Sequence, residues 1–137
     1  MAILTKLPQR FEDCEIRSIS FDHPNVVIKI FDPFEMDYYT ITYTNVAFMI
    51  METDHIQNVV GEIFDFQNFD EAIRQSSFKN YCILRDLSDL LRENYGNYRI
   101  GYYNPIAGGD IVLAYASLMV ELGMERNQSK MATLSQS

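Results

Sequence analysis

The sequence predicts an α+β protein, mainly an antiparallel β-sheet with one or two helices inserted before a C-terminal β-hairpin. Apolar and polar residues alternate in short segments between residues 14 and 66, which is the period of β-strands. Helical spacing of the apolar residues replaces this alternation from about 68 to 96, and strand patterns return up to residue 122. Strands and helices that are segregated along the chain favour α+β over alternating βαβ units. A β-sandwich with a helical insertion is the alternative.

The first two strands are expected at 14–22 and 26–31. The sequence between them, Asp-His-Pro-Asn, is typical of a turn. In the first strand Ile19 and Phe21 share one face, whereas Ile16 has the opposite parity. This change of parity predicts a bulge or a twist between Ile16 and Ile19.

Three further strands are predicted after a loop at 32–37. Residues 39–44 alternate Tyr or Ile with Thr, which predicts a strand with one apolar and one hydroxyl face. Asn45 is expected to mark a bulge or a brief break. Residues 46–51 carry apolar side chains on both faces, so this strand should be central or covered by a helix. A fifth strand is expected at 59–66, with a helix as the alternative.

Two helices are expected next. Asn68 precedes Asp70 and Glu71, and an N-cap side chain followed by acids in the first turn begins a helix. A longer helix follows, which Gly96 is well placed to end. Its apolar stripe predicts packing against the sheet, with Leu87 buried in the middle. The stripe consists of Ile83, Leu84, Leu87, Leu90 and Leu91.

The chain is expected to finish with a hairpin. Residues 98–103 and 111–122 have strand patterns, and the segment between them contains a proline and two glycines. Residues 1–122 should therefore form a single globular domain, which suits a chain of 137 residues. Residues 123–137 are polar and aperiodic, which predicts a flexible tail.

The charge of the chain is concentrated in one stretch. Nine carboxylates and no Lys or Arg lie between Lys29 and Arg74, whereas the net charge of the whole chain is −8. Such a stretch predicts a negative surface that attracts basic partners and repels nucleic acid and anionic lipid. An ordinary solvated surface is the alternative. The carboxylates are Asp32, Glu35, Asp37, Glu52, Asp54, Glu62, Asp65, Asp70 and Glu71.

Tyrosines accompany these acids on the predicted strands. Tyrosine offers apolar area and a hydroxyl group with few rotors to freeze, and it is enriched in recognition surfaces. Cross-strand aromatic packing in the core is the alternative for each tyrosine. The residues predicted to bind a protein partner are Asp32, Glu35, Asp37, Glu52, Asp54, Glu62, Asp65, Tyr38 and Tyr43.

No catalytic, cofactor-binding or metal-binding residue is predicted, so the protein is not expected to be an enzyme. His23 and His55 have no ligand or catalytic spacing, and neither Cys14 nor Cys82 lies in a nucleophile motif. Gly108-Gly109 is explained by a hairpin turn. The pI of about 4.6 argues against nucleic-acid binding. With no secretory signal and no apolar window that approaches a membrane span, a cytoplasmic location is expected.

Three segments within residues 11–122 carry a family resemblance: FEDCEIRSISFD, YTITYTNVAFMIMETDHIQNVVGEI and YRIGYYNPIAGGDIVLAYASLMVEL. Together they resemble a family of small bacterial proteins that includes the immunity proteins of polymorphic toxin systems. Members of this family often have a His beside the opening Asp, where this chain has Glu12 before Asp13. The resemblance implies a compact, mainly β protein without enzymatic activity.

Three functional hypotheses follow. The first is an immunity protein that neutralises a basic toxin domain through an acidic face. The second is an assembly protein that self-associates, for example as a homodimer, through a sheet edge or a Tyr-rich face. The third is an enzyme that uses paired carboxylates, with or without a metal ion.

Overall fold

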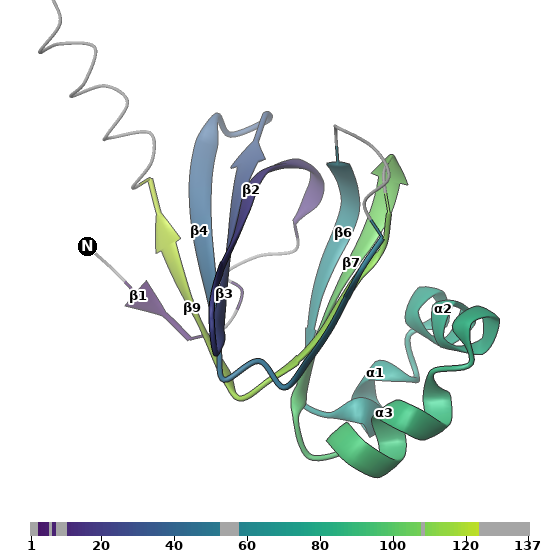
Figure 1. Ribbon diagram of the computed structural model, residues 1–137. Coiled ribbons are helices and arrows are strands. Elements are labelled where there is room, and N and C mark those ends of the chain that lie inside the picture. Colours follow the sequence, from purple (N-terminus) through teal and green to yellow (C-terminus); the bar gives the residue numbers. More distant parts are fainter. Residues whose placement is uncertain (1–2, 6, 8–10, 53–57, 108, 124–137) are drawn as a thin grey trace, which may run out of the picture.

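A computed structural model describes residues 3–5, 7, 11–52, 58–107 and 109–123 (Figure 1). These residues form one antiparallel sheet of nine strands and three short helices, which confirms the α+β prediction. The helices lie between two groups of strands in the sequence, as expected. The elements are β1 (Ile3–Leu4), β2 (Glu12–Asp22), β3 (Asn25–Asp32), β4 (Asp37–Thr44), β5 (Phe48–Met51), β6 (Asn58–Phe66), α1 (Phe69–Ala72), α2 (Ser76–Arg85), α3 (Ser88–Tyr95), β7 (Arg99–Ala107), β8 (Ile111–Tyr115) and β9 (Ser117–Leu122).

The sheet closes on itself. Its order is β1-β9-β4-β3-β2-β6-β7-β8-β5, but only Ala116 separates β8 from β9. Strands β4 and β5 are likewise parts of one bent segment. Two backbone hydrogen bonds, from Ala116 N–H to Thr44 O (3.0 Å) and from Ala47 N–H to Ala114 O (2.9 Å), join the β4–β9 and β5–β8 ladders. The strands β2, β3 and β4 therefore face β6 and β7 across a shared interior (Figure 1), and this arrangement is here called the barrel.

Three irregularities interrupt the strands of the barrel, and the sequence predicts two of them. The β2–β3 register shifts between Ile16 and Ser18, which confirms the predicted irregularity in the first strand. Asn45, at φ 50°, breaks the strand between β4 and β5. The long final strand predicted at 111–122 is instead interrupted at Ala116, where the chain passes from one wall of the barrel to the other.

The barrel interior is filled by the inward-facing residues of both walls. Alternation along β3 and β4 directs every second residue inward. Aromatic side chains are prominent in this core because four tyrosines point into it. Its buried residues are Phe11, Cys14, Val26, Ile28, Ile30, Tyr39, Ile41, Tyr43, Val60, Ile63, Tyr103, Ile111, Leu113, Tyr115, Leu118 and Val120.

A second core lies between the helices and the outer face of β6, β7, β8 and β5. All three helices cover this side of the barrel (Figure 1). Phe48 and Ile50 pack against this core, whereas Met49 packs against the barrel interior. The strand therefore has two apolar faces and a helical cover, which was one of the two predicted alternatives, but it is not central, because β5 ends the sheet order. The buried residues of the second core are Phe66, Phe69, Ala72, Phe78, Tyr81, Cys82, Leu87, Leu91, Ile100, Tyr102, Val112 and Ala114.

The helices are shorter than the sequence pattern predicts. Asn68 caps α1 by accepting the N–H of Glu71 at 2.9 Å, as expected. The prediction of a single long helix is wrong, because Asp86 adopts a left-handed conformation (φ 55°) that ends α2 before α3 begins. The change of direction leaves Ile83 and Leu84 exposed, at 62% and 82%. Leu87 is buried, at 7% exposure, as predicted.

None of these helices has the length and apolarity that a membrane span requires. The predicted tail lies outside the described residues from residue 124 onward.

Candidate partner-binding site

The hairpin loop between β3 and β4, residues 32–37, is acidic and tightly held; it is here called the acidic loop. Asp32 lies directly opposite Asp37 in the β3–β4 ladder. The Asp32 side chain is buried at the base of the loop, where its Oδ1 accepts the N–H of Phe34 at 3.0 Å and that of Glu35 at 3.4 Å. A carboxylate that accepts the N–H groups of the following residues fixes a turn.

Two apolar side chains project from this acidic loop. Phe34 is 73% exposed and Met36 is 59% exposed, with Glu35 between them. Met36 also has a left-handed backbone conformation (φ 56°), which costs a residue with a Cβ roughly 1–2 kcal/mol. Backbone strain of this kind concentrates at functional sites. The loop therefore presents apolar groups, framed by carboxylates, on a backbone that is already ordered.

The start of β2 adds more acids at the same end of the barrel. Glu15 lies opposite Phe31, next to the acidic loop, and Glu12 lies directly opposite Glu62 of β6. Like charges placed directly opposite each other in a sheet are destabilising. This end of the barrel nevertheless has two such pairs, Asp32–Asp37 and Glu12–Glu62, on neighbouring strands.

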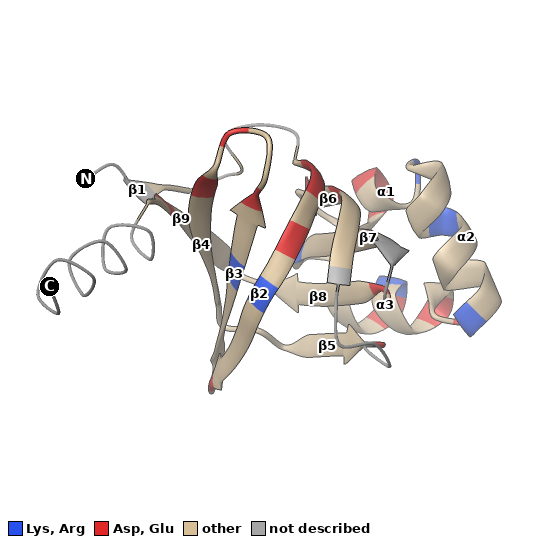
Figure 2. Cartoon of the chain, turned by 90° about the horizontal axis from the view of Figure 1, so that it is seen from above, with Lys and Arg blue, Asp and Glu red and all other residues tan. Residues whose placement is uncertain are grey.

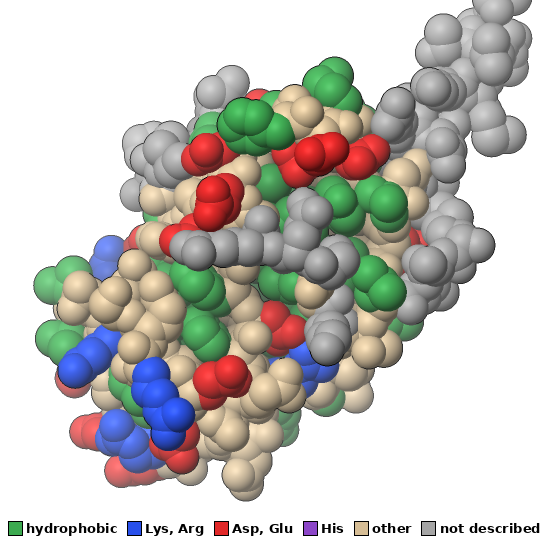
Figure 3. All heavy atoms as spheres, turned by 180° about the vertical axis from the view of Figure 1, so that it is seen from behind, with side chains coloured by type: hydrophobic (Ala, Val, Ile, Leu, Met, Phe, Trp, Pro, Cys, Tyr) green, Lys and Arg blue, Asp and Glu red, His purple; other side chains and the backbone are tan. Residues whose placement is uncertain are grey.

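The resulting surface is here called the acidic rim. Figure 2 shows acids where β2, β3, β4 and β6 meet at one end of the sheet. Figure 3 shows acidic side chains beside hydrophobic ones over the upper part of one face. The rim consists of Glu12, Asp13, Glu35, Asp37 and Glu62 at the surface, with the buried Asp32 beneath them.

The negative charges of these carboxylates raise the pKa of two buried side chains beneath the rim, Tyr39 and Cys14. The pKa of Tyr39 is raised by burial and then by Asp37, Asp32 and Glu35. The pKa of Cys14 is raised to about 12, first by burial and then by Asp32 and Asp13. Cys14 therefore remains a neutral thiol at physiological pH, which removes it as a nucleophile.

Tyr38 extends the site along the outer face of the hairpin. Its ring lies 4.8 Å from that of Phe31. Arg17 stacks on both rings, with its Cζ 4.7 Å from the Phe31 centroid and 5.9 Å from the Tyr38 centroid. Arg17 also pairs with Glu15 at 3.1 Å. This surface next to the rim thus already accommodates a guanidinium group between aromatic rings and a carboxylate.

The other predicted site residues lie away from the rim. Glu52 pairs with Arg85 of α2 at 2.8 Å, and Asp65 pairs with Arg99 of β7 at 2.5 Å. Asp54 lies outside the described residues. The expectation that Tyr43 faces a partner is wrong, because the parity of β4 directs its fully buried ring into the barrel.

Asp70 and Glu71 also belong to the stretch without Lys or Arg between Lys29 and Arg74, but they act at the start of α1. They occupy the first turn of α1, and Glu71 accepts the N–H of Gln67 at 2.5 Å. Negative charge at a helix N-terminus is favourable. These two acids therefore contribute to helix capping, away from the rim.

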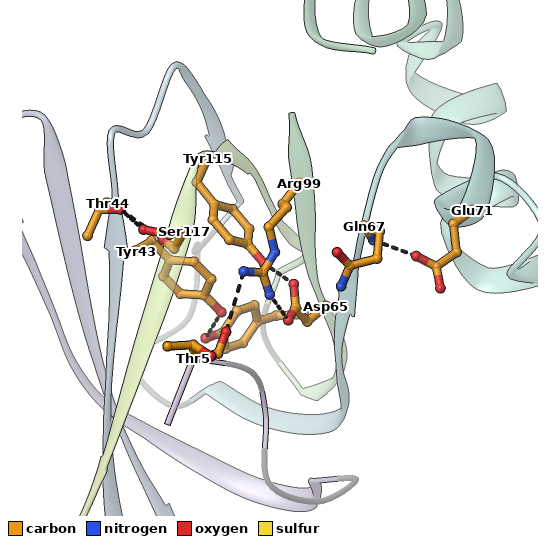
Figure 4. A network of polar contacts seen from close by, with 10 residues as sticks. Thr5, Tyr43, Thr44, Asp65, Gln67, Glu71, Arg99, Tyr115 and Ser117 are labelled. Carbon is orange, nitrogen blue, oxygen red and sulfur yellow. Dashed lines mark hydrogen bonds and ion pairs between the residues drawn. The ribbon is translucent and has the colours of Figure 1, made fainter. Parts of the chain in front are cut away.

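A second polar cluster lies inside the barrel wall (Figure 4). Asp65 accepts hydrogen bonds from Tyr115 and Arg99, and Arg99 also donates to Thr5 O at 3.4 Å. Burial raises the pKa of Asp65, although the contacts with Tyr115 and Arg99 act in the opposite direction. Burial also raises the pKa of the Tyr115 phenol, which is therefore a neutral hydrogen-bond donor, not a base. The cluster ties β6, β7, β8 and the segment after β1 together.

Sequence reasoning missed four residues of the candidate site. Glu12 and Asp13 lie before Lys29, where the stretch without Lys or Arg begins, and the pairing of Glu12 with Glu62 brings this segment to the rim. The sequence pattern assigns Phe34 and Met36 only to a loop. Large apolar residues inside an acidic turn were the available signal, because a short turn cannot bury them.

The remaining chemistry-bearing residues that the structure describes form no alternative centre. In the part of the chain that the structure describes, no three His, Cys, Asp or Glu side chains are grouped so as to hold a metal ion. His23 is exposed and His55 lies outside the described residues. Cys14 and Cys82 are buried and unpaired.

Comparison of the sequence with family models and curated proteins, and of the structure with solved structures, finds no match.

Proposed function

We propose that the protein is a non-enzymatic binding protein that recognises a basic surface of a partner protein through the acidic rim. The observation that carries this proposal is the display of Phe34 and Met36 between carboxylates on an ordered loop. Interfaces gain most of their affinity from a few apolar or aromatic anchors surrounded by a polar border. The acidic loop has the same composition on a small scale, with two apolar side chains surrounded by carboxylates.

The charge distribution supports a basic partner. The described strands and their loops carry twelve carboxylates and three cations, whereas residues 69–96, which contain the helices, carry five carboxylates and four cations. The negative field therefore originates mainly from the barrel. Such a field accelerates encounter with a positive surface and disfavours nucleic acid and anionic lipid.

The finer proposal is that the partner is a basic toxin domain and that the protein acts in the cytoplasm as its immunity protein. Toxins that cleave nucleic acid bind phosphates with positively charged sites, and a row of carboxylates on a rigid edge would occupy such a site. The resemblance of three sequence segments to immunity proteins supports this partner class.

The test uses Phe34→Ser and a matched control, Leu84→Ser. Both residues are exposed and apolar, but Leu84 lies on α2, outside the acidic rim. Each variant is immobilised, proteins are captured from the native host, and the captured basic proteins are purified and titrated. Wild type and Leu84→Ser should bind the same protein, more weakly as salt is added. Phe34→Ser should bind it at least about tenfold more weakly, which corresponds to roughly 1.4 kcal/mol.

Two results would contradict the proposal. One is equal binding by wild type and Phe34→Ser, which would place the interface elsewhere. The other is loss of binding in Leu84→Ser alone, which would move the interface to the helices. The immunity role is tested separately, because co-expression with the captured protein should protect cells only when the rim is intact.

A further inference from the structure

We infer that the outer edge of β5 pairs with β5 of a second copy, giving a two-fold symmetric dimer at the end of the barrel opposite the acidic rim. Strand β5 ends the sheet order, with β8 on its inner side (Figure 2). Among the described residues, none pairs with its other side. This inference does not depend on the proposed function.

The hydrogen-bond phase of β5 determines which backbone groups are available. Glu52 N–H bonds to Asp110 O at 3.0 Å, in register with the pairs Met51–Ile111 and Ile50–Val112. Hydrogen-bonded and non-bonded pairs alternate along an antiparallel ladder. The N–H and C=O groups of Met49 and Met51 therefore point away from β8, towards the open edge.

These groups match a second β5 in antiparallel orientation. In the proposed register, Met49 of each copy lies opposite Met51 of the other. The outward N–H and C=O groups of both residues then all form hydrogen bonds between the two copies. Ile50 then lies opposite its own copy on the two-fold axis. The strand, Phe-Met-Ile-Met, has no charge that would face itself across this axis. It also lacks the Lys and Pro residues by which edge strands usually avoid pairing.

A cavity of about 320 Å³ next to β5 provides space for the added strand. Met49 lines it, together with apolar residues of the β2–β3 turn region that include Phe21 and Val26. Residues paired across an antiparallel ladder share a face of the sheet. Met51 of the second copy, opposite Met49, would therefore lie over this cavity. Methionine fills irregular apolar spaces well, and in a single copy Met51 is 37% exposed.

The position of this edge allows two acidic molecules to associate. Strands β2 and β3 run between the two ends of the barrel, with Glu12 and Asp32 at the rim and Phe21 and Val26 at the cavity. Contact at the cavity end keeps the two acidic rims apart. This separation reduces the repulsion between the rims of two chains of net charge −8. Of the acids beside the edge itself, Glu52 pairs with Arg85 at 2.8 Å, and Asp22 is exposed at the β2–β3 turn.

The test measures the mass of the full-length protein by sedimentation. The wild type should be a dimer. Met51→Pro should have half that mass, because proline removes an outward N–H that the β5–β8 ladder does not use. Met51→Val retains the N–H and should remain a dimer. Circular dichroism checks that both variants are folded.

Cross-linking tests the register and decides the question if Met51→Pro fails to fold. Non-hydrogen-bonded partners in antiparallel strands have Cα atoms about 4.5 Å apart, within disulfide range. Ile50→Cys should therefore form an intermolecular disulfide on mild oxidation. A wild type that is monomeric at all concentrations, or a dimer that neither Met51→Pro nor Ile50→Cys affects, would overturn the inference. A monomer that binds extended peptides at this edge would assign it to another protein.

Discussion

Asp32 accepts the backbone N–H of Phe34 at 3.0 Å, so a buried carboxylate at the base of the acidic loop positions the exposed ring at its tip. The same carboxylate faces Asp37 across the ladder. Asp32 thus combines a stabilising turn with a like-charge pair, two effects of opposite sign. Substitutions can separate them.

Asp32→Ala should lower the free energy of unfolding by about 1–3 kcal/mol, because two loop N–H groups lose their acceptor. Asp32→Asn keeps an acceptor oxygen and removes the charge opposite Asp37, so it should remain within about 1 kcal/mol of wild type. Urea unfolding at neutral pH measures both variants. Equal losses would show that the turn hydrogen bonds contribute little.

Leu87→Ala should cost on the order of 2–5 kcal/mol, because it opens a space in the core between helices and sheet. The matched control is Leu84→Ala, whose side chain is 82% exposed and should change stability by less than about 0.5 kcal/mol. Thermal unfolding compares the two. An unshifted transition in Leu87→Ala would mean that this side chain does not belong to the core.

Tyr43→Phe should cost about 1–3 kcal/mol, because it leaves the Tyr103 hydroxyl without its partner at 2.7 Å inside the barrel. The double variant Tyr43→Phe/Tyr103→Phe removes both polar groups and should regain part of the loss. A double-mutant cycle from urea unfolding measures this coupling. Strictly additive losses would argue against a hydrogen bond between the two phenols.

The two thiols should be protected in the folded protein. Burial is the main cause that raises the pKa of Cys14 to about 12 and that of Cys82 to about 11. Both should react slowly with a thiol reagent at pH 8 and rapidly after unfolding in denaturant. Rapid labelling of the native protein would show that a core opens readily.

The same shifts predict a loss of stability at alkaline pH. Above the ordinary thiol pKa of 9.0 the unfolded chain loses protons that the folded chain keeps. The stability contributed by these thiols should therefore be complete below pH 9 and should fall as the pH rises towards about 12. Cys14→Ala should show a shallower decline in urea unfolding over this range.

The local sequence determined the strands and the faces that they bury. Alternation in β3 and β4 assigns Val26, Ile28 and Ile30 to one face by their period of two alone. The helix start at Asn68 also follows from neighbouring residues, because a cap acts within one turn. Such features depend on residues a few positions apart, which the sequence displays directly.

Tertiary structure alone decided how these elements meet. The closure of the barrel depends on the bend at Ala116 and on pairing between segments far apart in the chain. Glu12 lies opposite Glu62, 50 positions further along the chain, because β2 pairs with β6. The acid-rich stretch begins only after Lys29, so the sequence alone could not predict that Glu12 belongs to the rim. Asp65 belongs to that stretch, but in the folded chain β7 brings Arg99 against it, so its charge is paired away from the rim. The field of a charge depends on distance in space, and folding sets those distances through long-range pairing.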